Sequence, residues 1–110
     1  MKKIVKYNKL IRDKIPEIIK KDGWNPIIKT LSKKQYLTAL KKKILEEAEE
    51  LIIAKKRKDV IDEIVDIQEL LDHLVSEIKL TKLEIENQQK KKNEKRGRFK
   101  KRLFLIREEK

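Results

Sequence analysis

The sequence predicts an all-α protein: a helical bundle built on two long antiparallel helices and completed by homo-oligomerisation. Residues 33–56 and 60–78 form two stretches without glycine or proline, and each carries apolar residues at helical spacing. The connection between them is short, so the two helices are expected to be antiparallel neighbours. Hydrophobic residues make up 38% of the chain and aromatic residues only 5%, so the core is expected to consist of Ile and Leu.

A short helix is expected before the two long ones, over residues 12–21. Asp13 can cap its start, and Pro16 is tolerated in its first turn. Gly23 ends the helix, and a brief extended link leads on to the first long helix.

Capping signals mark the starts of the remaining helices. Ser32, followed by Gln35 at the third position after it, is a capping box for the first long helix. Asp59 is expected to cap the second long helix. Thr81 is expected to start a fourth helix with a capping box, as Ser32 starts the first long helix. Gly97 is expected to break that fourth helix.

The two ends of the chain are candidates for short strands. Residues 2–7 alternate loosely between polar and apolar types, and residues 99–107 contain an apolar run, so the two segments could pair. With 110 residues, the chain is expected to form a single domain over residues 1–110. Its small core predicts association into a homodimer or a higher homo-oligomer.

Composition excludes several classes of protein. The absence of cysteine excludes disulfides and thiolate chemistry, and a single histidine argues against a zinc site. No stretch approaches the roughly 18 apolar residues of a membrane span, and the N-terminus lacks a signal-peptide apolar run, so a cytoplasmic protein is expected. The net charge of +12 suggests a polyanionic partner, either nucleic acid or a nucleoside triphosphate. Surface lysine without a specific role explains the charge equally well.

Carboxylates gather on both long helices. Glu46, Glu47 and Glu50 fall within an arc of roughly 100° on the first. Glu63 and Asp66 share a face of the second. Like charges at these spacings destabilise an isolated helix by roughly a few tenths of a kcal/mol per pair, and both clusters border apolar faces. A divalent cation bound by oxygen ligands would offset this cost, whereas an ordinary solvated acidic face is the commoner alternative.

The positions of the two carboxylate clusters along the helix axes favour a shared metal. Glu50 lies about one to two turns before the end of the first long helix, and Glu63 lies about one turn into the second. In an antiparallel pair these positions are at a similar level, so both clusters can converge on one ion.

The acidic pattern resembles the metal site of the all-α NTP pyrophosphatases, the MazG-like and phosphoribosyl-ATP pyrophosphohydrolase-like proteins. The matching motifs are Glu-Glu-x-x-Glu at residues 46–50 and Glu-x-x-Asp at residues 63–66. Residues 7–19 are similar to the opening of one small branch of that superfamily. Residues 95–99 resemble the basic Gly-Phe segment of the same branch, with Arg98 in place of a second glycine.

The resemblance implies a Mg²⁺-dependent hydrolase, with Mn²⁺ as a second candidate metal. It would cleave a nucleoside triphosphate between the α and β phosphates to give a monophosphate and pyrophosphate, with the metal neutralising phosphate oxygens and activating water. The expected metal ligands are Glu47, Glu50, Glu63 and Asp66. Glu46 is expected to orient or deprotonate the attacking water, and a rotation of the helix would exchange Glu46 and Glu47.

Cationic residues of the two terminal motifs are the candidates for binding the substrate phosphates, and they are Lys9, Arg12, Lys14, Arg96, Arg98 and Lys100. The competing interpretation is a basic helical nucleic-acid-binding protein without enzymatic activity, which explains the charge directly. It leaves the paired carboxylate clusters unexplained, because these repel phosphates unless a metal is bound. The sequence does not decide whether His73 and Trp24 have structural roles or roles in the site. In the site, Trp24 would stack on a base.

Overall fold

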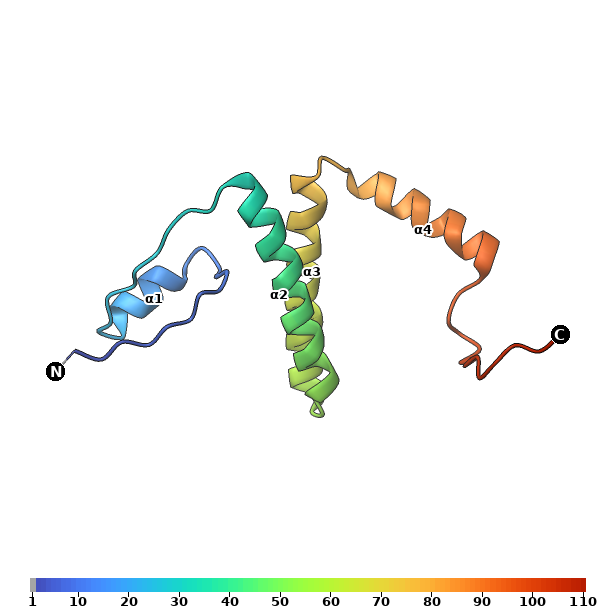
Figure 1. The fold of residues 1–110 in the computed structure, drawn as a ribbon, viewed down its shortest axis with the longest axis horizontal. Coiled ribbons are helices and arrows are strands. Elements are labelled where there is room, and N and C mark those ends of the chain that lie inside the picture. Colours follow the sequence, from blue (N-terminus) through green and yellow to red (C-terminus); the bar gives the residue numbers. More distant parts are fainter. Residues whose placement is uncertain (1) are drawn as a thin grey trace. The chain divides into compact units, whose positions relative to one another are not determined.

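The computed structural model describes residues 2–110 and contains four helices over that range (Figure 1). They are α1 (Ile15–Lys21), α2 (Lys33–Ile53), α3 (Arg57–Glu77) and α4 (Lys82–Arg96). No strand occurs among these residues, so the predicted all-α class is confirmed. None of the helices in the described range is both long enough and apolar enough to cross a membrane.

The chain divides into two compact parts. The first ends at Ile78 and contains α1, α2 and α3. The second is Lys79–Lys110 and contains α4 and the segment that follows it; it is called the C-terminal part below.

The expectation of short terminal strands is wrong. Neither residues 2–7 nor residues 99–107 form a strand. The second segment is interrupted by Arg102, whose φ of 57° is left-handed and whose N–H donates to the C=O of Phe99 in a turn. Alternation alone does not make a strand, because the backbone N–H and C=O groups need a pairing partner.

The short helix α1 begins at Ile15 and not at Arg12, so its predicted start is wrong. Its N-cap residue is Lys14 and not Asp13, and no side chain caps it. Pro16 explains the later start, because proline has no N–H to donate to the C=O of Arg12. The proline therefore has to lie in the first turn, where it is found.

The two long helices lie side by side in the first part of the chain (Figure 1). At the start of α2, the Ser32 hydroxyl accepts a 3.2 Å hydrogen bond from the Gln35 N–H, and the Gln35 side chain accepts a 3.1 Å bond from the Ser32 N–H. The predicted capping box is thus present. At the start of α3 the N-cap is Lys56 and not Asp59, which lies in the first turn. There its charge still favours the helix dipole, although the predicted cap is wrong.

The apolar surface of the helix pair is only partly covered. Within residues 2–110, Leu40 is the one buried hydrophobic side chain, at 1% exposure. Many large apolar side chains of α2 and α3 are exposed, among them Leu45, Ile52, Ile61, Ile64, Val65 and Leu71. The aliphatic core expected from the composition is therefore a partly buried contact between α2 and α3.

Replacing Ser32 with alanine is expected to lower the free energy of unfolding by about 1 kcal/mol. The change removes the acceptor of the Gln35 N–H and leaves that donor at the helix start without its side-chain partner. Urea denaturation followed by circular dichroism measures the effect. Ser76→Ala, at an exposed position near the end of α3, is the matched control. An equal loss in both variants would mean that the cap contributes nothing.

Candidate metal centre

Three carboxylates from the two long helices meet at one point. Glu47 and Glu50 of α2 and Glu63 of α3 each offer one oxygen, and these oxygens all lie within 4.8 Å of one another. The spacing of three residues puts Glu47 and Glu50 on one face of α2. The adjacent helix supplies Glu63 from the other side. Three of the four predicted ligands are thus brought together by the packing of α2 against α3.

Two oxygens of this cluster are buried without a hydrogen-bond partner. Glu47 is buried at 7% exposure, and its Oε2 has no hydrogen-bond donor while both Glu47 and Glu63 are ionised. Oε2 of Glu63 is also buried and without a partner. A buried carboxylate oxygen without a donor carries a large desolvation cost, so a cation at this point would remove an otherwise unfavourable feature.

The electrostatics of the cluster reflect that cost. Burial raises the pKa of Glu47 from 4.5 to about 7, assisted by a hydrogen bond from its protonated form to Glu63. The negative charges of Glu50, Glu63 and Asp66 raise the pKa further in the same direction. Lys43 is the nearby cation, with its Nζ 3.8 Å from Oε1 of Glu47. Without a metal, the site therefore favours a neutral Glu47.

Glu46 lies outside the cluster. Its side chain is half exposed, and its Oε2 is 3.3 Å from the Nζ of Lys43. Adjacent residues of a helix are rotated by about 100°, so the packing that turns Glu47 inward leaves Glu46 at the edge. The rotation of α2 in this structure therefore puts Glu47, and not Glu46, among the converging carboxylates.

Asp66, the fourth predicted ligand, is engaged elsewhere. Its Oδ1 accepts a 2.7 Å hydrogen bond from a guanidinium NH of Arg12, in an ion pair whose side chains are 57% and 37% exposed. Asp66 is not part of the group of three converging oxygens. The negative charge of Asp66 still helps to raise the pKa of Glu47, so Asp66 lies close to the cluster. The ion pair also brings Arg12 from the N-terminal motif to the edge of the site.

The other cationic candidates have contacts away from the carboxylate cluster. Lys9 lies with its Nζ 5.0 Å from the centroid of the Tyr7 ring, and Lys14 is the N-cap of α1. Arg96, Arg98 and Lys100 belong to the C-terminal part, where they line a hollow of their own.

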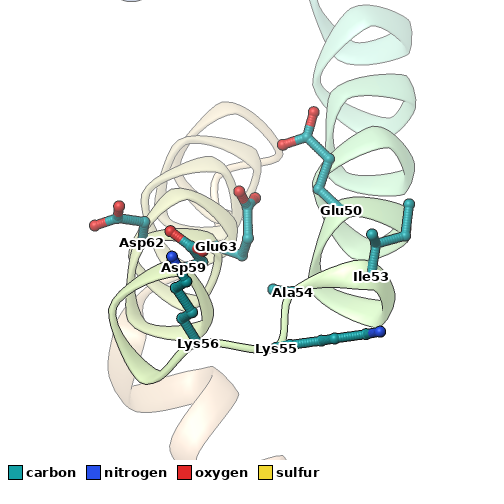
Figure 2. Close-up of a pocket in the computed structure, with 8 residues that line it drawn as sticks. All are labelled: Glu50, Ile53, Ala54, Lys55, Lys56, Asp59, Asp62 and Glu63. Carbon is teal, nitrogen blue, oxygen red and sulfur yellow. The ribbon is translucent and has the colours of Figure 1, made fainter.

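The cluster opens into a hollow at the connection between α2 and α3 (Figure 2). Glu50 reaches into it from α2 and Glu63 from α3. Four further polar residues line the hollow and were not expected there from the sequence: Lys55, Lys56, Asp59 and Asp62. Their closeness in sequence to the short connection between the two helices could have identified them as lining residues. Figure 2 shows the Lys56 side chain directed toward Asp59.

The two residues left open by the sequence have local contacts. His73 pairs along α3 with Glu69, with 2.6 Å between Nε2 and Oε2. The backbone N–H of Trp24 donates to the C=O of Ile19 at the end of α1, and its side chain is half exposed. Both observations fit structural roles.

Comparison with known proteins gives one partial match. No family model and no solved structure matches this chain. An uncharacterized protein of Mycolicibacterium smegmatis is 43% identical to it over 53 residues, which is 48% of this chain and 54% of that protein. The chain thus spans about half the length of the relative that it matches, and the match assigns neither a family nor an activity.

Proposed function

We propose that the protein is a Mg²⁺-dependent nucleoside triphosphate pyrophosphohydrolase that cleaves between the α and β phosphates. The observation that carries this proposal is the convergence of Glu47, Glu50 and Glu63 within 4.8 Å, with a buried and unpaired oxygen on Glu47. The resemblance of residues 46–50 and 63–66 to the metal motif of the all-α NTP pyrophosphatases supports the same activity.

The donor set fits Mg²⁺ or Mn²⁺. Carboxylate oxygens are the ligands that these hard cations prefer, and the chain has no cysteine for a softer metal. Glu47, Glu50 and Glu63 would hold the ion, with α2 and α3 antiparallel so that all three reach one point. Asp66 would complete the set after release from Arg12. The bound ion would supply charge neutralisation at the phosphates and an acidified water.

The remaining polar groups have separate roles in this proposal. Glu46 is half exposed beside the buried Glu47, where it would accept a proton from the attacking water. Arg12, at the edge of the site, would donate two parallel hydrogen bonds to two phosphate oxygens once Asp66 has turned to the metal. The open hollow at Glu50 and Glu63 gives the triphosphate access to the carboxylates.

A panel of nucleoside triphosphates tests the proposal. The purified protein is incubated with each nucleotide and Mg²⁺, and pyrophosphate and orthophosphate are measured separately. Pyrophosphate release that requires Mg²⁺ and is abolished by EDTA is expected for at least one nucleotide. Release of orthophosphate alone, or no release from any of them, would refute the proposed reaction.

Arg12→Ala is expected to affect metal and nucleotide binding in opposite directions. Loss of the ion pair frees Asp66 for the metal, and an exposed pair contributes about 0.2–1 kcal/mol, so Mg²⁺ should bind up to about fivefold more tightly. Nucleotide binding should weaken by about tenfold or more, because a charged hydrogen bond to phosphate is lost. Titration with Mg²⁺ and then with a non-hydrolysable triphosphate separates the two effects. Lys41→Ala is the exposed control, and an Arg12 variant that binds nucleotide as this control does would make Arg12 purely structural.

The exposed apolar side chains of α2 and α3 support a homodimer. The helix pair fully buries a single apolar side chain and leaves several others exposed to water, and a second copy can cover these. Light scattering at micromolar concentration is expected to give about twice the monomer mass of 13.2 kDa, or a higher multiple. A stable monomer under these conditions would contradict the association.

A further inference from the structure

The positive charge of the protein is concentrated in its C-terminal part. Lys79–Lys110 holds thirteen Lys or Arg residues against five Asp or Glu residues, so it carries +8 of the net charge of +12. Within it, residues 90–102 hold nine cations and one acidic residue, Glu94. The candidate metal centre lies in the other part of the chain and gives no reason for this concentration of charge.

Packing does not explain the helix of this part either. Over Lys82–Arg96 the apolar residues are Leu83 and Ile85, both in the first turns, so α4 has no apolar stripe. All its residues except the half-buried Asn93 are exposed. A helix that is polar on all sides has no apolar face to pack against a core, so all of its sides face the solvent.

After α4 the chain forms a basic hollow that contains aromatic rings. Five Lys or Arg side chains between Arg96 and Arg102 line it, together with Phe99 and Phe104. Gly97, with a φ of 81°, ends α4, and the turn from Phe99 to Arg102 folds the segment back on itself. The two rings are 99% and 88% exposed, so their faces are available to a ligand.

We propose that this basic hollow, residues 96–104, binds single-stranded nucleic acid. Backbone phosphates would contact the Lys and Arg side chains, and unpaired bases would stack on Phe99 and Phe104. Exposed rings among cations favour a single strand, because the bases of a duplex are already stacked on one another. This function is independent of the proposed hydrolysis, and it gives Arg96, Arg98 and Lys100 a phosphodiester chain as partner in place of a triphosphate.

The composition of α4 argues against an anionic membrane as the partner, although Leu103, Leu105 and Ile106 beside the rings are also exposed. A membrane-surface helix needs an apolar face opposite its basic one, and α4 has none. The exposed rings lie instead within the cluster of cations, which is the arrangement of a single-strand site.

Binding of the full chain to a fluorescent 20-nucleotide oligothymidylate, followed by anisotropy in EDTA, tests the proposal without any contribution from hydrolysis. The test variant is Arg98→Glu with Lys100→Glu and Lys101→Glu. The control is Lys33→Glu with Lys34→Glu and Lys41→Glu, three exposed positions of α2 that change the net charge by the same amount. The test variant is expected to lose about 100-fold in affinity and most of the salt dependence, and the control about threefold or less. Equal losses in both would overturn the proposal.

The aromatic contribution is tested separately. Phe99→Ala is expected to weaken oligothymidylate binding by roughly 5- to 150-fold and to leave duplex binding unchanged, since stacking on an unpaired base is lost. An unchanged affinity for the single strand would overturn the proposal and leave only non-specific attraction between charges. Tighter binding to phosphatidylserine vesicles than to the oligonucleotide would identify a membrane surface instead. A mononucleotide triphosphate that binds as tightly as the oligonucleotide would identify a substrate subsite and likewise overturn the proposal.

Discussion

Replacing Glu63 with glutamine is expected to reduce Mg²⁺-dependent pyrophosphate release by at least about 100-fold. Glu63 is the ligand that α3 contributes to the three converging oxygens, so its loss leaves Asp66, which is paired with Arg12, as the remaining proposed ligand from α3. Replacing residues that merely hold metal ligands costs about 10- to 100-fold, and the loss of a ligand charge should cost no less. Glutamine has nearly the same shape as glutamate, so α2 and α3 are expected to pack as before.

The measurement has two readouts. Pyrophosphate release reports activity, and the Mg²⁺-induced rise in thermal midpoint reports metal binding without any catalytic step. Asp72→Asn is the control, since it makes the same chemical change at an exposed position of α3 outside the cluster. Full activity and a wild-type response to Mg²⁺ in the Glu63 variant would show that the cluster is not the metal centre.

The metal-free protein is expected to lose stability as the pH rises from 4.5 to above 7. The pKa of Glu47 is raised to about 7 in the folded state, so the folded protein holds a proton there that the unfolded chain releases near pH 4.5. Stability therefore falls through this range and reaches its lower level above pH 7. A tenfold change in an acid dissociation constant corresponds to about 1.4 kcal/mol, so the total loss is up to about 3 kcal/mol.

Mg²⁺ is expected to reverse this trend. The ion binds the ionised carboxylate, so its affinity should rise with pH up to about 7, and its stabilising effect should be largest above that value. Urea denaturation at pH 5 and pH 8, with EDTA or with Mg²⁺, measures both effects.

Glu47→Gln provides the decisive variant for this pH dependence. A neutral amide removes the cost of a buried charge, so the metal-free variant should be more stable than the wild type at pH 8 and similar to it at pH 5. Its response to Mg²⁺ should be lost at both values. Glu49→Gln, at an exposed position two residues further along α2, is expected to change neither property. A wild-type pH profile in the Glu47 variant would mean that another group causes the effect.

Local signals account for the elements that the sequence predicted correctly. The Ser32 and Thr81 caps and the Gly97 break depend on hydrogen bonds and backbone angles within a few residues, and all three are found at the expected places. The capping box is complete at Ser32, whereas at Thr81 only the bond from the Glu84 N–H to the Thr81 hydroxyl is present. The starts of α1 and α3 were misplaced, because Asp13 and Asp59 are suitable caps that compete with neighbouring positions. The terminal strands failed for a different reason, since a strand needs a partner that no local pattern specifies.

The sequence by itself determined the helices, the acidic residues on two of them and the concentration of cations near the C-terminus. These properties follow from residue type and from the period of the helix, which are local. Only the tertiary structure decided that Glu47 turns inward while Glu46 stays at the edge, and that Asp66 pairs with Arg12. The physical reason is that the rotation of a helix about its axis is set by how its side chains fit the neighbouring helix. Adjacent residues about 100° apart are therefore assigned to the site or to solvent by packing and not by their own chemistry.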